Sequence, residues 1–196
     1  MKEQKMKESP ELEELFRGRN NVKCTDNDLR SVIGERLKEG NKITNKKRYF
    51  CGIGNAVNPE YVTAFLINDW NFSAGLENNF NEFQIVGFSR YNRCVYDAQL
   101  EQRIVGNNNK LRICTVYVSD GNEHHGIGSA GVQIITDFAR MLGCKEIRGN
   151  AESYLNRTEE GEERLQDFYK KNGFVFEEDD HVFRMKLRSE ERRVGK

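Results

Sequence analysis

Two histidines and three glycines stand close together in the segment NEHHGIGSAG, residues 122–131. Gly126, Gly128 and Gly131 have the GxGxxG spacing of loops that approach a pyrophosphate. Because glycine has no Cβ, such a loop can come close to a ligand or to another part of the fold. The residues leave four interpretations open: a dinucleotide, a metal held by the histidines, a phosphate bound without a dinucleotide fold, or a tight turn without a ligand.

The sequence around the loop disfavours a dinucleotide. In that fold the glycines follow the preceding strand within a residue or two. Here the connection from Ser119 to Gly126 is longer, although Glu152 stands at a distance that suits a ribose. A dinucleotide fold also needs several further strand–helix units, and little of the chain remains after the next expected strand.

A metal site is also disfavoured. His124 and His125 are adjacent, so their side chains diverge, and His181 is far away in the sequence. No cysteine or carboxylate has the spacing that would complete a zinc site, so we expect no metal. A phosphate suits the loop better, because a helix N-terminus offers free N–H groups and the positive end of the dipole.

The elements that position this loop are clearest in the last part of the chain. Residues 111–119 predict a buried strand before the loop, and residues 127–142 predict a helix after it that ends at Gly143. A short strand at 144–151, a second helix that ends at Asn172-Gly173, and two closing strands, FVFEE and HVFRMKL, follow. This order predicts an α/β domain.

The N-terminal half is less regular. Residues 26–38 predict a helix, and strand-like runs occur at 49–51, 61–67 and 83–91, with no order implied. We expect residues 1–21 to form a flexible or loosely docked arm, residues 22–188 a single domain, and residues 189–196 a charged tail.

Charge and cysteine usage limit the classes of function. The 31 basic residues balance 31 acidic ones, so composition implies no nucleic-acid partner. No apolar run approaches the roughly 20 residues that cross a bilayer, and the charged N-terminus does not resemble a signal peptide, so we expect no membrane partner. Five scattered cysteines without CxxC spacing favour a reducing compartment, hence a cytoplasmic localisation. The sequence leaves open whether the chain forms a homodimer.

Residues 111–187 resemble the C-terminal half of the GNAT superfamily of acetyl-CoA-dependent N-acetyltransferases. One motif is VYV, formed by Val116, Tyr117 and Val118, before residues 123–128 in the place of Q/R-x-x-G-x-G/A. The other is FYKKNGF, residues 168–174, before the closing strands, and IVGF, residues 85–88, is similar to a mid-sheet strand of the family. The resemblance implies a central mixed, splayed β-sheet flanked by helices, with an N-terminal extension.

The resemblance also implies a reaction, the direct transfer of acetyl from acetyl-CoA to a primary amine. The strand with Val116, Tyr117 and Val118 would pair with the pantetheine arm. Tyr169 matches a tyrosine that often protonates the leaving sulfur. The implied acceptor is a small-molecule amine, or a lysine or N-terminus of a protein. The pyrophosphate would be held by the backbone of His124, His125, Gly126, Ile127, Gly128 and Ser129.

Departures from the family pattern keep alternatives open. Glu123 replaces the family's cation or glutamine, and Glu162 stands where members commonly carry an asparagine. The nearest upstream asparagine, Asn156, is our candidate for that cofactor contact. A catalytically inactive module that binds CoA or a partner is therefore the alternative, and an NAD-dependent oxidoreductase is less favoured.

Two further features concern the acceptor. The acidic runs 159–163 and 177–180 would attract a cationic amine if they border its channel, or else form a solvated face. A proton acceptor for the amine is not assigned by spacing; Asp120, Glu82 and Asp97 are chemically suitable.

Overall fold

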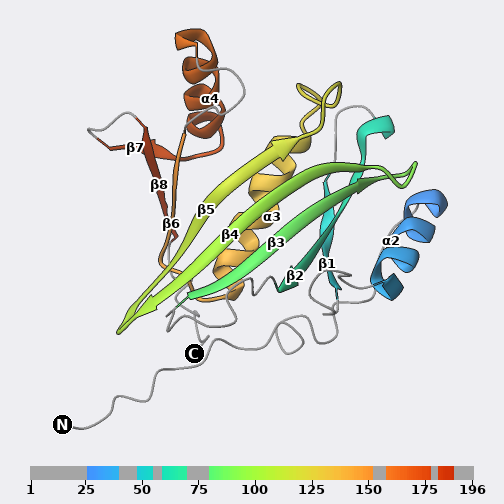
Figure 1. The fold of residues 1–196 in the computed structure, drawn as a ribbon, viewed down its shortest axis with the longest axis horizontal. Coiled ribbons are helices and arrows are strands. Elements are labelled where there is room, and N and C mark those ends of the chain that lie inside the picture. The colour runs from blue at the N-terminus through green and yellow to red at the C-terminus, as the bar shows by residue number, and fades with distance from the viewer. Residues whose placement is uncertain are drawn as a thin grey trace, which may run out of the picture.

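A computed structural model describes residues 26–39, 48–54, 59–69, 80–151, 158–177 and 181–187. The expected arm at 1–21, the tail at 189–196 and Asn156 lie outside these residues. The helices are α2 (Asn27–Glu39), η1 (Pro59–Tyr61), α3 (Ile127–Met141) and α4 (Glu159–Lys171) (Figure 1). The strands are β1 (Arg48–Gly54), β2 (Thr63–Asp69), β3 (Phe80–Ser89), β4 (Cys94–Val105), β5 (Asn108–Val118), β6 (Glu146–Asn150), β7 (Val175–Phe176) and β8 (Val182–Lys186).

The strands form one eight-stranded sheet in the order β1-β2-β3-β4-β5-β6-β8-β7. Six of the neighbouring pairs are antiparallel. The exception is β5–β6, which is parallel and is connected through α3. A parallel pair needs such a crossover because its strands run in the same direction. The predicted α/β fold with a mixed sheet flanked by helices is therefore confirmed.

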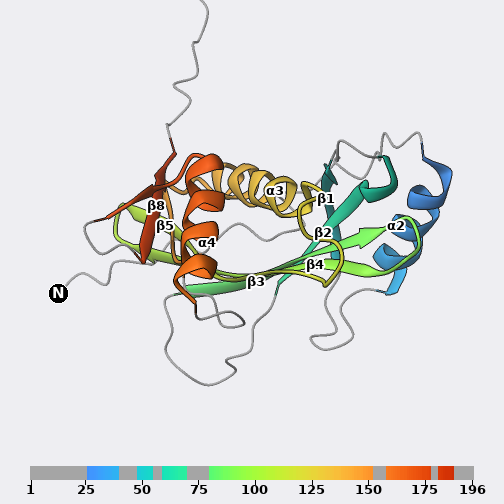
Figure 2. The same ribbon diagram turned by 90° about the horizontal axis from the view of Figure 1, so that it is seen from above.

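The helices cover opposite faces of this sheet. Helix α3 lies across one face (Figure 2). Because successive side chains of a strand point to opposite faces, β2 is buried on both sides. Its Phe65 and Ile67 join the core beneath α3, whereas Ala64 and Leu66 pack with residues of α2.

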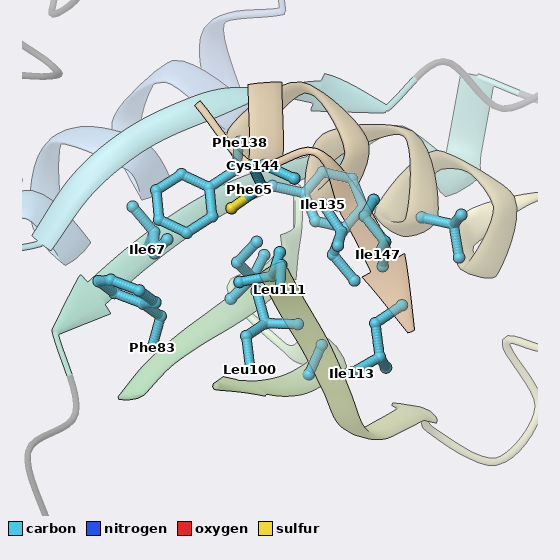
Figure 3. Close-up of a cluster of buried hydrophobic side chains, with 14 of the residues drawn as sticks. Phe65, Ile67, Phe83, Leu100, Leu111, Ile113, Ile135, Phe138, Cys144 and Ile147 are labelled. Carbon is cyan, nitrogen blue, oxygen red and sulfur yellow. The ribbon is translucent and has the colours of Figure 1, made fainter. Parts of the chain in front are cut away.

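The larger core lies between α3 and the sheet (Figure 3). Phe138 of α3 meets Phe83 of β3 edge to face, with the ring centroids 5.0 Å apart. Ile135 of α3 is fully buried, as are Leu111 of β5 and Ile147 of β6. This packing joins α3 to the middle of the sheet, so the N-terminus of α3 has a fixed position relative to the end of β5.

Strand β4 was missing from the sequence-based expectation. Its apolar residues alternate with polar ones, and Tyr96, Ala98 and Leu100 are buried beneath α3. The hairpin to β5 turns at Gly106, whose φ of 59° is left-handed. This alternation and the glycine turn are the signals that could have predicted β4. Because the hairpin is tight, β5 begins at Asn108 rather than at Leu111.

Both predicted helix ends in the C-terminal half are confirmed. Gly143 follows α3 with a φ of 69°, and Gly173 follows α4 with a φ of 87°. Glycine adopts these left-handed conformations without the steric cost of a Cβ. Among the helices that the structure describes, none is both long and apolar enough to span a bilayer.

Candidate functional site

The sheet opens along one edge of β5. The parallel pairing with β6 runs from Lys110–Glu146 to Ile113–Gly149 and then ends. Beyond it, residues 114–118 of β5 pair only with β4 among the strands that the structure describes. This stretch, called the open segment below, includes the predicted residues Val116, Tyr117 and Val118. The edge of the open segment facing away from β4 carries backbone groups to which an extended ligand can pair as an added strand.

A β-bulge marks the beginning of the open segment. Leu100 of β4 pairs with Ile113, but the next residue, Gln99, pairs with Thr115. Cys114 is therefore an extra residue in β5. A bulge bends a strand and increases its twist, and this one follows the last β5–β6 pair directly. It accounts for the divergence of the two strands, so the predicted splay of the sheet has a local cause.

The open segment leads into a loop with several left-handed residues. Gly121, His124 and Gly126 have φ values of 77°, 63° and 86°. Gly126 is also the N-cap of α3, and no side chain caps the helix there. The first amide of α3 to donate within the helix is that of Ala130, to the carbonyl of Gly126 at 2.9 Å. The amides of residues 127–129 thus lack intrahelical partners, as a helix N-terminus dictates, and they suit an anion.

The three glycines of the motif differ in what they are needed for. Gly126 has open space around the position of a Cβ and is required by its left-handed backbone. A Cβ on Gly128 would lie 3.2 Å from the ring of Phe168, and one on Gly131 would lie 2.6 Å from the hydroxyl oxygen of Tyr96. Gly128 and Gly131 therefore allow close packing within the fold, and only Gly126 shapes the loop.

The two histidines of the loop also differ. His124 is exposed and left-handed. His125 stacks on Tyr61 of η1, with ring centroids 3.5 Å apart and an angle of 10° between the planes. Tyr61 thereby ties the loop to the segment before β2. No local sequence pattern predicts this contact, because 63 residues lie between Tyr61 and His125 and the contact depends on how the N-terminal strands pair.

The other predicted loop residues contribute mainly through their backbone. The side chain of Ile127 is buried in the core at 2% exposure. The hydroxyl of Ser129 accepts a hydrogen bond from Nδ2 of Asn172 at 3.3 Å, which links α3 to the end of α4. Asn172 was expected only as part of a helix end. The side chain of Glu123 is exposed to solvent.

Tyr169 of α4 is brought to the same region. It is 4% exposed, and its ring stacks on Phe183 of β8 with the centroids 3.9 Å apart. Burial raises the pKa of the Tyr169 phenol well above its ordinary value. The neighbouring Phe168 is the side chain that packs against Gly128. Helix α4 thus closes over the first turn of α3 beside the open segment.

A polar chain crosses the face of the sheet opposite α3. Asn68 donates to Gln84 at 3.0 Å, and Gln84 donates to Oδ2 of Asp97 at 2.6 Å. Burial raises the pKa of Asp97, although the bond from Gln84 opposes the shift. Asp97 pairs in register with Tyr117 of the open segment. Of the three carboxylates considered from the sequence, Asp97 is therefore on the strand beside the open segment and in register with it.

A cavity of about 320 Å³ lies beside the first residues of the loop, at the end of β5. It is walled by the β3–β4 turn, by η1 and by the residues after β5, and it includes Asp120. Its charged lining mixes Glu60 and Asp120 with Arg93, so it does not select one sign of charge. Among the described residues, no three His, Cys, Asp or Glu side chains gather in a way that could hold a metal ion.

The arrangement of strands bears on the dinucleotide interpretation. Such a fold binds its ligand at the end of several parallel strands. Among the strands described here, only β5 and β6 are parallel. The glycine motif therefore follows β5 of a mixed sheet and forms the N-cap and first turns of the crossover helix α3.

No family model matches the chain, and no curated protein matches its sequence. Several solved structures are similar to it. Naa50 of Arabidopsis thaliana, in complex with the bisubstrate analogue CoA-Ac-MVNAL, is 18% identical with a TM-score of 0.44, over 53% of this chain and 72% of that one. PaiA N-acetyltransferase of Thermoplasma acidophilum, in complex with coenzyme A, is 20% identical with a TM-score of 0.41, over 53% and 60%.

A putative acetyltransferase of the GNAT family from Desulfovibrio desulfuricans is 12% identical with a TM-score of 0.42, over 55% of this chain and 69% of that one. Similarities at such low sequence identity bear on the fold and carry no conclusion about activity. The mixed sheet, its splay after Ile113 and the loop before α3 are those that the sequence resemblance implied, whereas the strand order was not predicted. The chain thus has the mixed, splayed sheet that the sequence resemblance implied, and its glycine loop lies at the open edge of that sheet.

Proposed function

We propose that this chain is an N-acetyltransferase that transfers the acetyl group of acetyl-CoA directly to a primary amine. The observation that carries the proposal is the continuity of the open segment with the uncapped N-terminus of α3. Acetyl-CoA has a matching arrangement, because its extended pantetheine arm is joined directly to its pyrophosphate. The strand edge suits the arm, and the helix N-terminus suits the phosphates.

The loop and α3 would bind the donor through backbone groups. The amides of residues 124–129 would donate hydrogen bonds to the phosphates. The dipole of α3 adds the equivalent of about half a positive charge at its N-terminus. The exposed Glu123 is a departure from the family pattern that does not block the amides. When bound, acetyl-CoA supplies an acyl group that is activated as a thioester.

Tyr169 is our candidate for the proton donor to the leaving sulfur. Its raised pKa keeps the phenol protonated at neutral pH, as a general acid requires. The ring is held by Phe183 and Phe174, so the hydroxyl has a fixed position. Asn156, which the resemblance places at the cofactor, lies outside the described residues and stays a prediction.

Asp97 is our candidate for the proton acceptor from the amine. A carboxylate with a raised pKa is a better base than one on the surface. Gln84 holds one carboxylate oxygen at 2.6 Å. Asp97 lies one strand from the open segment, and an arm paired along that segment would lie about 5 Å further on, so a bridging water would carry the proton.

Thermal unfolding with acetyl-CoA, CoA or NAD tests donor binding. At a hundredfold excess over its Kd, a ligand adds about 2.7 kcal/mol, which for a chain of this length raises the Tm by about 5–10 °C. We expect a shift with acetyl-CoA and CoA and none with NAD. A shift with NAD alone would favour an oxidoreductase and contradict the proposal.

A pair of variants at Ser129 makes this test specific to the loop. Ser129→Glu places a carboxylate at the third position of α3, where it stabilises the helix N-terminus but repels a phosphate. Ser129→Gln is the neutral control of the same size. Both variants replace the hydroxyl that accepts from Asn172, so we expect their Tm values without ligand to be similar to each other. Ser129→Glu should lose the shift with CoA, while Ser129→Gln keeps most of it. Equal shifts in both variants would show that the anion binds elsewhere.

Turnover separates an enzyme from a module that binds CoA without catalysis. Release of the CoA thiol is followed with spermidine, an aminoglycoside, a lysine peptide and a peptide with a free N-terminus as acceptors. Asp97→Asn should slow the reaction with an amine that is charged at neutral pH, by about a hundredfold. It should affect hydroxylamine much less, because that acceptor is already neutral. Equal losses with both acceptors would exclude Asp97 as the proton acceptor.

A further inference from the structure

The hydroxyl of Tyr96 is a buried polar group whose partner is missing. Tyr96 lies on β4, its side chain is 1% exposed, and its Oη has no hydrogen-bond partner among the described residues. Leaving such a group unpaired costs free energy that a phenylalanine of the same shape would avoid. Burial raises the pKa of Tyr96 well above its ordinary value, and Tyr169 and Asp97 add to the shift. The group is therefore a neutral hydroxyl with a proton to donate.

Tyr96 lies beside the open segment. Its backbone pairs in register with Val118, the last residue of β5. Its ring lies between the sheet and α3, edge to face with Phe65 at 5.2 Å between centroids. The hydroxyl reaches the helix at Gly131, where an added Cβ would stand 2.6 Å from Oη. The added Cβ would lie nearer still to the ring, 2.2 Å from Cζ, so the glycine makes room for the whole phenol of Tyr96 beneath α3.

Three other elements meet at this position. Val118 ends the open segment and packs towards Gly128 in the first turn of α3. Gly128 in turn contacts Phe168 of α4. The phenol of Tyr169 is close enough to that of Tyr96 to affect its pKa. The unpaired hydroxyl therefore belongs to the region in which β5, α3 and α4 converge, where the donor's arm is proposed to enter.

We propose that Tyr96 is a donor-binding residue whose hydroxyl hydrogen-bonds an acceptor atom of the acyl-pantetheine arm. This inference rests on the proposed function, since it names a contact within the same site. A buried, fixed hydroxyl is well suited to the task, because its rotamer is already set by Phe65 and Gly131 before the ligand arrives. The partner missing from the protein is then supplied by the ligand.

The substitution Tyr96→Phe removes only the hydroxyl and tests the proposal by calorimetric titration. We use acetyl-CoA as the ligand, and adenosine 3′,5′-bisphosphate as a ligand without the arm. The variant should bind acetyl-CoA about tenfold more weakly, the loss expected for one buried hydrogen bond. Binding of the bisphosphate should not change. Without ligand, the Tm of the variant should equal or exceed that of the wild type, because an unpaired buried hydroxyl has been removed.

This pattern has opposite signs for binding and stability, which a structural role would not produce. Tyr91→Phe is the matched control, because Tyr91 is 67% exposed on the β3–β4 turn and should leave all three measurements unchanged. Equal affinity of Tyr96→Phe and wild type for acetyl-CoA would overturn the inference, and so would a lowered Tm of the ligand-free variant. A wild-type protein that binds neither acetyl-CoA nor CoA would instead contradict the proposed function itself.

Discussion

Burial decides the chemistry of Tyr169. A phenol on the surface ionises near its ordinary pKa of 10.0, whereas burial raises the pKa of this one. The aromatic rings of Phe168, Phe174 and Phe183 surround it and provide no charge that would stabilise a phenolate. The side chain therefore keeps its proton at neutral pH and well into the alkaline range.

Replacing Tyr169 with phenylalanine tests its role as a proton donor. We expect kcat to fall by about a hundredfold, the lower range for general acid catalysis, with little change in the Kd of acetyl-CoA. The wild-type pH profile should show no alkaline fall from this residue below about pH 10, because a raised pKa keeps the phenol protonated as the pH rises through the ordinary value. Equal kcat in the variant and the wild type would exclude the role.

The packing of helix α3 on the sheet depends on a small residue at one point. The helix crosses the sheet where the ring of Tyr96 rises towards it, and Gly131 is the residue that faces the ring. By contrast, Gly34 in α2 has nothing within 4 Å of the position of a Cβ, and its backbone is not left-handed. The two helical glycines therefore differ in purpose, although both lower helix propensity.

Alanine at these two positions should have opposite effects. Gly131→Ala should lower the free energy of unfolding by about 1–3 kcal/mol, because the added methyl overlaps the Tyr96 ring. Gly34→Ala should raise it by about 0.5–1 kcal/mol, because alanine restricts the unfolded chain and favours the helix. Urea denaturation of both variants measures the changes. Stabilisation by Gly131→Ala would show that the ring moves away without cost.

At the scale of the whole molecule, the thiols report on the integrity of the core. Cys144 follows α3, is 6% exposed, and donates its S–H to Oδ1 of Asn109 at 3.2 Å. Burial raises the pKa of Cys144 to about 12. Cys94 and Cys114 are exposed residues whose thiols are only partly buried. Their pKa is therefore raised less than that of Cys144. Because the thiolate is the reactive form, these groups should differ widely in rate.

Alkylation with iodoacetamide at pH 7.5, followed by peptide mapping, checks this order. Cys94 and Cys114 should be modified first, and both faster as the pH rises, because more thiolate forms. Cys144 should be modified only when the domain unfolds, and should react as fast as the others in guanidinium chloride. Rapid labelling of Cys144 in the native protein would mean that the core between α3 and β6 opens locally.

Local sequence was sufficient for part of the fold. The strand before the glycine loop, the helix after it and the left-handed stops at Gly143 and Gly173 follow from residues that are neighbours in the chain. Strand β4 was not predicted although its alternation is visible in the sequence. Polar residues on the face opposite α3 weaken its apolar signal. The order of the N-terminal strands was not predicted, because it depends on which strands pair edge to edge in the folded sheet.

Local sequence patterns were enough to predict the elements and the loop of the C-terminal half, because helix periodicity, turn glycines and capping act within a few residues. How those elements form a site follows from the three-dimensional packing. The end of the β5–β6 pairing at Ile113, the stacking of Tyr61 on His125 and the position of Tyr96 beneath Gly131 all join residues far apart in the chain. Such contacts depend on strand register and packing, which a single sequence does not encode in its local pattern.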